Sequence, residues 1–171
     1  MSNSSITLIA DGATARIAAL GGELKSLAFA GTPELLWQAD AAYWDRTAPF
    51  LFPQISRTAD LRLRIGGHEG EMPQHGFARD SMFAITTREP SRCVLTLRDS
   101  DATRALYPFA FTLTVEYRLS ARALDLVATV ANPGTAPLIF QFGWHPGFVL
   151  PLPPAATRDG HTIAVSPVAG R

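Results

Sequence analysis

Two segments of the sequence combine an imidazole with glycine, aromatic or guanidinium groups, and these groups together can handle a polar substrate. His75 lies in the run 74–80, where the following glycine lets a ligand approach closely and Arg79 offers a planar set of donors. His145 directly follows Trp144. An imidazole among aromatic rings suits a sugar site, because pyranose C–H faces stack on rings while hydroxyls need polar partners. Taken alone, the His75 pattern favours a loop histidine bonded to a backbone carbonyl, and the alternative for His145 is a hydrogen-bonded core histidine.

Other chemistries find little support in the residue pattern. No pair among the four histidines, which are His68, His75, His145 and His161, has HxH or HxxxH spacing, and no CxxC is present, so no metal site is expected. No GxSxG motif supports a serine nucleophile. Cys93 begins an apolar run and is expected to be a buried, inert thiol, and His68 is expected at a hairpin turn.

Composition excludes several classes of partner. Lys plus Arg and Asp plus Glu both count 15, so the net charge is zero and neither nucleic acid nor an anionic membrane is indicated. The first residues have no basic region followed by an apolar stretch, which predicts neither a secretion signal nor a membrane span. One cysteine fits a reducing cytoplasm. A length of 171 residues favours one domain over the whole chain.

The elements that must position these groups are expected to be strands. Apolar and polar residues alternate along 109–119 and again along 124–131, and Asn132-Pro133-Gly134 then turns the chain. Shorter candidates are 6–10, 24–29, 61–65, 82–88, 93–98 and 162–165, and the apolar run 138–140 is expected to be a strand end leading to His145. No window of helical length has an amphipathic pattern, while 13 Gly and 13 Pro punctuate the chain. The expected fold class is all-β, a sandwich or barrel.

With these motifs in order, the sequence resembles the aldose 1-epimerase family. The resemblance is carried by six segments that follow one another in the family's order: 21–27 (GGELKSL), 34–37 (ELLW), 43–44 (YW), 49–53 (PFLFP), 73–80 (PQHGFARD) and 142–148 (FGWHPGF). It implies a galactose mutarotase-like β-sandwich, or supersandwich, and a reaction that interconverts the α and β anomers of a free hexose by acid/base ring opening. No cofactor is implied.

The same resemblance implies roles for individual residues. His145 matches the general acid that protonates the ring oxygen, and His75 matches a second histidine that hydrogen-bonds near that oxygen. Arg57 matches a substrate-contacting arginine. The further residues expected to bind substrate are Arg79, Gln74 and Trp144. An imidazole can both give and retake a proton near neutral pH, which suits this chemistry.

The sequence departs from the family pattern in its length. Family members are substantially longer, and their general base is a Glu, aided by an Asp, far toward the C-terminus. After His145 this sequence offers only Asp159 as a carboxylate side chain. The chain is therefore expected to be a truncated, incomplete sandwich. Losing a positioned base removes about 10²–10⁴-fold of rate, so the activity is expected to be impaired.

Two other functions stay open at this stage. One is a hexose-6-phosphate 1-epimerase, in which Arg57 and Arg79 would clamp the phosphate. The other is a non-catalytic carbohydrate-binding fragment, or a half-sandwich completed by another chain. Exposed sheet edges would then favour self-association into a homo-oligomer. In each case the expected ligand is a small aldose or hexose phosphate.

Overall fold

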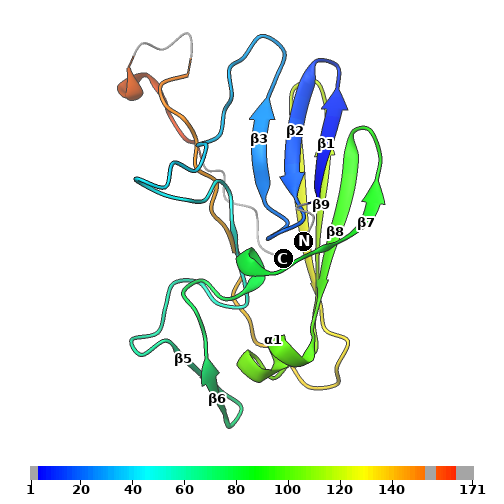
Figure 1. The fold of residues 1–171 in the computed structure, drawn as a ribbon, viewed down its shortest axis with the longest axis vertical. Coiled ribbons are helices and arrows are strands. Elements are labelled where there is room, and N and C mark those ends of the chain that lie inside the picture. The colour runs from blue at the N-terminus through cyan, green and yellow to red at the C-terminus, as the bar shows by residue number, and fades with distance from the viewer. Residues whose placement is uncertain (1–3, 153–156, 165–171) are drawn as a thin grey trace.

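Two antiparallel sheets face each other and enclose the apolar core. The structure, a computed structural model, describes residues 4–152 and 157–164. One sheet has the order β1-β2-β3, and the other has the order β10-β9-β8-β7. Strands β1 and β2 contact β8 and β9 across the interface (Figure 1). The strands are β1 (Ser5–Ala10), β2 (Ala13–Ala18), β3 (Leu24–Ala28), β7 (Ala84–Arg88), β8 (Arg92–Arg98), β9 (Thr112–Leu119) and β10 (Leu124–Ala131).

Several smaller elements make up the rest of the described structure. Strand β4 (Phe50–Leu51) pairs with β11 (Gly143–Trp144), and β5 (Arg62–Ile65) forms a hairpin with β6 (His68–Glu71). One α-helix, α1 (Asp101–Leu106), and two 3₁₀ turns, η1 (Ala78–Asp80) and η2 (Arg158–Gly160), complete the described elements. None of the described helices is long and apolar enough to cross a membrane.

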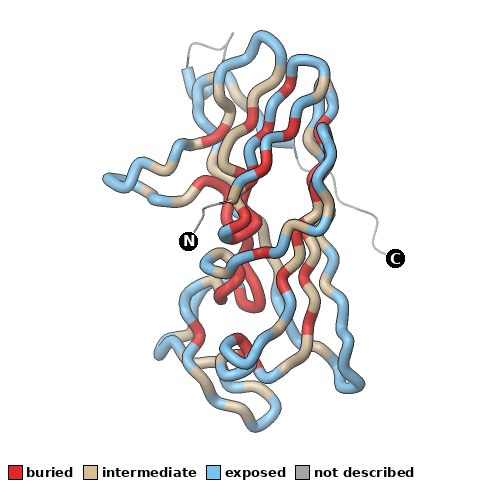
Figure 2. The backbone as a smooth tube through the Cα atoms, turned by 45° about the vertical axis from the view of Figure 1, so that its right-hand side comes forward, coloured by how far each residue is buried: buried red, intermediate tan, exposed pale blue. Residues whose placement is uncertain are grey.

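Apolar and polar residues alternate along the strands, and the apolar side chains that face inward form the core. Leu113, Val115 and Tyr117 of β9 are fully buried, as are Ile6 and Leu8 of β1 in the facing sheet. Burying each large apolar side chain contributes about 1.5–3 kcal/mol. Along these strands buried positions alternate with more exposed ones (Figure 2), as expected when one face of each sheet is covered.

The all-β class predicted from the sequence is confirmed, and so are most of the strands. The pattern at 124–131 is strand β10, and those at 6–10, 24–29, 61–65, 82–88, 93–98 and 109–119 correspond to β1, β3, β5, β7, β8 and β9, with ends that differ by up to three residues. The expected burial of Cys93 is also confirmed. His68 is not in the hairpin turn but is the first residue of β6, opposite Ile65, because Gly66 and Gly67 form the turn.

Three features differ from the sequence-based expectation. The apolar run 138–140 is not a strand, and the short strand lies later, at Gly143–Trp144. Strand β2 was not predicted, because its inward positions include the small residues Ala13 and Ala15. Helix α1 was not predicted either, since it depends on a local cap in which Ser100 and Thr103 satisfy each other's backbone N–H groups. Residues 162–164 form no strand, and Val165 lies outside the described residues.

Candidate functional site

A polar cavity of about 500 Å³ lies where three distant chain segments meet. Its lining comes from 44–51, from 74–79 and from His145. The full set is Trp44, Asp45, Arg46, Pro49, Leu51, Gln74, His75, Arg79 and His145. Both histidines singled out in the sequence therefore face one space, together with Gln74 and Arg79. The cavity is large enough for a monosaccharide-sized ligand.

His75 is held by its backbone and by its ring. Its φ of +68° is uncommon for a residue with a side chain. The conformation is fixed because the His75 N–H donates to Ser56 O (2.7 Å) and the Ser56 N–H donates back to His75 Nδ1 (2.9 Å). Since Nδ1 accepts a hydrogen bond, the neutral ring carries its proton on Nε2. Nε2 is thus a donor at the cavity. The Gln74 Nε2 atom, 3.3 Å away, is also a donor, so the two side chains can hydrogen-bond only if the Gln74 amide presents its oxygen to the ring instead.

The charge state of His75 is shifted toward neutral. Partial burial lowers the pKa of this imidazole below its usual 6.5, and repulsion from Arg79 and His145 lowers the pKa further. An added positive charge on His75, close to Arg79, is therefore unfavourable. Near neutral pH, His75 is suited to donate a hydrogen bond from a neutral ring.

His145 is placed by the pairing of β11 with β4. Its N–H donates to Pro49 O (3.1 Å), and two residues later the Gly147 N–H donates to Thr47 O (2.9 Å). The imidazole lies beside Trp44, with ring centroids 5.2 Å apart and the planes inclined by 43°. His145 itself is exposed, so its ring can meet a ligand. An indole and an imidazole at this spacing can contact the C–H face and the oxygens of one sugar ring.

Gly76 allows the His75 loop to cross β4 at close range. A Cβ atom at Gly76 would lie 2.1 Å from Phe52 O, well inside van der Waals contact, and the φ of +75° also favours glycine. Phe52 O accepts hydrogen bonds from the N–H groups of Phe77 (3.0 Å) and Ala78 (3.2 Å). Backbone contact between the two loops therefore sets the position of His75.

The cationic side of the cavity contains two arginines. Arg46 forms an ion pair with Asp80 (2.7 Å), and its Nη1 donates to the Arg79 carbonyl (3.4 Å). Arg79 Nε is buried and lies 3.5 Å from Asp80 Oδ2, but makes no hydrogen bond to any described residue. The Arg79 side chain as a whole is 20% exposed and lines the cavity, so the rest of its guanidinium, rather than the buried Nε, can meet a ligand oxygen.

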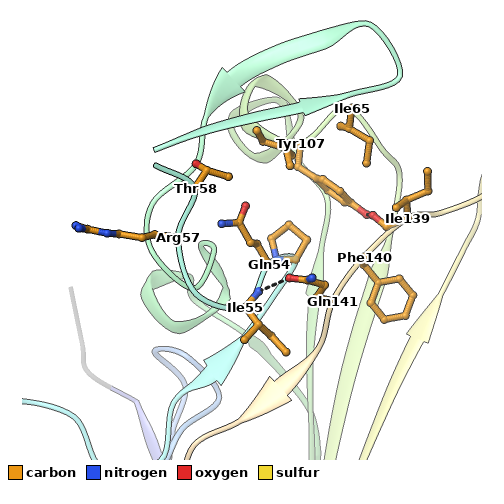
Figure 3. Close-up of a pocket in the computed structure, with 11 residues that line it drawn as sticks. Gln54, Ile55, Arg57, Thr58, Ile65, Tyr107, Ile139, Phe140 and Gln141 are labelled. Carbon is orange, nitrogen blue, oxygen red and sulfur yellow. Dashed lines mark hydrogen bonds between the residues drawn. The ribbon is translucent and has the colours of Figure 1, made fainter. Parts of the chain in front are cut away.

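Two residues expected to bind substrate lie away from this cavity. The Trp144 indole N–H donates to Ala48 O (3.1 Å), and the side chain packs against the core, so the residue holds β11 in place. Arg57 is exposed and lines a second pocket of about 340 Å³. Figure 3 shows the Arg57 side chain extending away from the other residues of that pocket. Its only link to the first cavity is its neighbour Ser56, which binds His75. The substrate roles of Trp144 and Arg57 stay predictions.

The second pocket is mostly apolar. Pro53, Leu63, Ile65, Ile139 and Phe140 supply its walls, and the Tyr107 hydroxyl in it donates to Ile139 O (2.7 Å). Of its polar groups, Gln141 Oε1 accepts the Ile55 N–H at 2.9 Å (Figure 3), whereas Thr58 Oγ1 is buried without a hydrogen-bond partner among the described residues. It contains no histidine or carboxylate, so it offers no acid/base pair.

Five residues of the cavity were not predicted as site residues from the sequence: Trp44, Asp45, Arg46, Pro49 and Leu51. Trp44 belongs to the segment 43–44 that carries the family resemblance, and that was the available signal. Asp45 and Arg46 have no motif of their own, and only the fold brings them opposite His75. Among the described residues no cluster of three or more metal-ligating side chains occurs.

The arrangement can bind a neutral polar ring and move protons around it. Trp44 offers an aromatic face, Arg79 and His75 offer donors, and His145 presents an imidazole at the open side. The one carboxylate lining the cavity is Asp45, which is exposed and lies 3.8 Å from Arg46 Nε. Such a site fits acid/base chemistry on a small hydroxylated substrate.

Comparison with known proteins gives consistent matches. The family model described as aldose 1-epimerase matches residues 4–167. The protein "LacX, chromosomal" of Lactococcus lactis subsp. lactis is 28% identical over 165 residues, which cover 91% of this chain and 54% of that protein.

Solved structures agree with the fold. A galactose mutarotase related enzyme from Lactobacillus acidophilus superposes with a TM-score of 0.82 at 32% identity, covering 86% of this chain and 50% of that one. A galactose mutarotase-like protein from Lactobacillus casei gives 0.80 at 35% identity, covering 85% and 50%. The expected galactose mutarotase-like β-sandwich is confirmed. The chain spans about half the length of the relatives it matches.

Proposed function

Because the chain belongs to the aldose 1-epimerase family, we propose that it binds a free hexose in the cavity between Trp44, His75 and His145 and promotes interconversion of its anomers. One observation carries the proposal: the two histidines that resemble the family's catalytic pair, 70 positions apart, line one cavity beside an aromatic ring. The reaction class is an isomerisation without a cofactor.

In the proposed reaction His145, in its protonated form, donates a proton to the ring oxygen as the bond from that oxygen to the anomeric carbon breaks. A base removes the proton of the anomeric hydroxyl, and the open-chain aldehyde forms. Rotation and ring closure on the other face reverse both proton transfers. His75, with its proton on Nε2, donates a hydrogen bond to the substrate near the ring oxygen.

Within the part of the chain that the structure describes, the cavity contains no well-positioned general base. Asp45 lines the cavity, but it is exposed and has no neighbour that orients it other than Arg46. A base that is not positioned forfeits about 10²–10⁴-fold of rate. We therefore propose that the chain binds hexoses and that its turnover is slow relative to an enzyme with a positioned carboxylate.

Mutarotation of freshly dissolved α-glucose and α-galactose, followed by polarimetry and by NMR, tests the proposal. The wild-type chain is expected to accelerate the approach to equilibrium, and His145→Gln is expected to remove at least about 10-fold of that acceleration. His68→Gln is the matched control, because His68 lies in β6 outside the cavity. Sugar binding without any acceleration would leave a carbohydrate-binding module, and neither binding nor acceleration would refute the proposal.

A phosphorylated hexose is the second candidate substrate, and the cationic side of the cavity favours it. Arg46 and Arg79 line the cavity together, and the buried Arg79 Nε has no hydrogen-bond acceptor among the described residues. Arg57, which was expected to complete the clamp, does not line this cavity. If phosphate binds here, Arg79→Ala should weaken glucose 6-phosphate binding much more than glucose binding, and equal losses would exclude it.

The surroundings of the sandwich support three further proposals. The buried cores of the two sheets are continuous, so we propose that 1–171 is one domain.

Strand β10 ends its sheet, and Val127, Ile139 and Phe140 are exposed nearby. We therefore propose that copies of the chain associate through this edge, which light scattering at rising concentration would detect. The lone, buried Cys93 supports a reducing cytoplasm as the location, testable by cell fractionation.

A further inference from the structure

A buried carboxylate lies directly beneath the candidate site without lining it. Glu23 directly precedes strand β3 and is only 6% exposed, although it carries a carboxyl group. Its Oε1 accepts the N–H groups of Thr47 (2.7 Å) and Ala48 (2.9 Å), and its Oε2 pairs with Lys25 Nζ (3.2 Å). A charge is retained at such depth only when it is fully paired, so these contacts are a requirement of the fold.

The segment 47–49 is bound on both of its sides. Its N–H groups point to Glu23, while its carbonyls point to the opposite strand region. Thr47 O, Ala48 O and Pro49 O accept from the Gly147 N–H (2.9 Å), the Trp144 indole (3.1 Å) and the His145 N–H (3.1 Å). The peptide group that joins Thr47 to Ala48 is hydrogen-bonded at both ends, to Glu23 through its N–H and to Gly147 through its carbonyl, so its rotation is restricted. Glu23 is thus two hydrogen bonds away from the backbone of His145.

The turn 21–23, which contains Glu23, also contacts the chain next to Arg79 on another wall of the cavity. The Gly21 N–H donates to Ser81 O (2.8 Å), and a Cβ at Gly21 would lie 2.7 Å from the Arg79 carbonyl. Gly22 O in turn accepts the hydroxyl of the buried Tyr117 (2.8 Å), which anchors the turn in β9. The turn 21–23 therefore contacts two of the three chain segments that bear cavity side chains, 44–51 and the segment that contains Arg79, and ties them to β9.

We infer that Glu23 is a positioning residue, which fixes His145 against Trp44 by holding the backbone of 47–49. The importance of this role for catalysis rests on the proposed function, in which His145 acts on the substrate. Its geometric content can be tested without any activity. Removing the carboxylate leaves two buried N–H groups without an acceptor, which frees the segment 47–49 to move.

The test uses amide hydrogen exchange and ring-proton NMR on the full chain. In Glu23→Ala, the N–H of His145 and the Trp144 indole N–H are expected to exchange at least about 10-fold faster, while ladder amides of β8 and β9 keep their rates. The ring protons of His145 are expected to lose the upfield shift caused by the Trp44 indole. Glu23→Gln, which keeps one acceptor oxygen, should restore much of both signals and serves as the variant if Glu23→Ala does not fold.

Glu34→Ala is the matched control. Glu34 Oε1 also accepts two backbone N–H groups, those of Leu27 and Leu36 at 2.9 Å, but it does not touch 47–49 or line the cavity. Unchanged exchange at His145 in Glu23→Ala, or an equal change in Glu34→Ala, would overturn the inference. Hexose affinity should fall at least about 10-fold more in Glu23→Ala than in Glu34→Ala. If the wild-type chain binds no hexose, the proposed function fails while the exchange data still decide the positioning role.

Discussion

Replacing Gly76 by alanine isolates the contact that places His75. The φ of +75° at Gly76 costs a residue with a side chain about 1–2 kcal/mol. The new Cβ would also lie 2.1 Å from Phe52 O and 2.4 Å from Phe52 C, so the two loops must separate by about 1 Å to reach ordinary contact. That movement weakens the hydrogen bonds from Phe77 and Ala78 to Phe52 O, each contributing about 0.5–1.5 kcal/mol.

The summed loss is about 2–5 kcal/mol in the free energy of unfolding, which corresponds to a fall of roughly 4–20 °C in Tm for a chain of this size. Urea denaturation followed by circular dichroism measures the loss. Gly31→Ala is the matched control, because Gly31 has the same φ of +75° and nothing within 4 Å of the new Cβ. It should lose only the conformational part, about 1–2 kcal/mol. Equal losses in the two variants would refute the reasoning about close approach.

Three other predictions follow from single side chains. Because the folded state lowers the pKa of His75, the unfolded state binds more protons, so stability should fall as the pH drops through 6.5; urea midpoints should show less of this pH dependence in His75→Gln. Burial raises the pKa of Cys93 to about 11, so the thiol should resist iodoacetamide at pH 8 in the folded chain and react on unfolding; rapid labelling of the native chain would contradict its burial. Tyr107→Phe should lose about 0.5–1.5 kcal/mol in thermal unfolding, because it removes the hydroxyl bond to Ile139 O; an unchanged Tm would argue against that bond.

The sheets could be predicted where large apolar residues alternate with polar ones. Strands β9 and β10 follow that rule over eight residues each, and both were predicted. Strand β2 has the same alternation in burial, but two of its three inward side chains are alanines, which carry too little hydrophobic contrast. Helix α1 has only six residues, so its cap at Ser100 defines it rather than its periodicity.

The site was predictable only in part, because motifs name residues and the fold decides where each side chain points. His75, Gln74, Arg79 and His145 lie together as expected. Trp144 belongs to a motif as well, but strand alternation at β11 turns the indole toward Ala48 while His145 faces the cavity. The supporting role of Glu23 could not be predicted, since its partners lie 24 and 25 positions away in a loop without a pattern of its own.

The pairing of β4 with β11 has a consequence for the order of folding. The contact from the Trp144 indole to Ala48 spans 96 positions, whereas β7, β8, β9 and β10 pair with their neighbours in sequence. Closing a long loop costs more entropy than closing a short one, so the meander formed by β7, β8, β9 and β10 can form before the cavity does. Substitutions in the meander should then slow folding, while those at the β4–β11 junction should mainly speed unfolding. The residues proposed for catalysis would be the last to find their neighbours and the first to lose them.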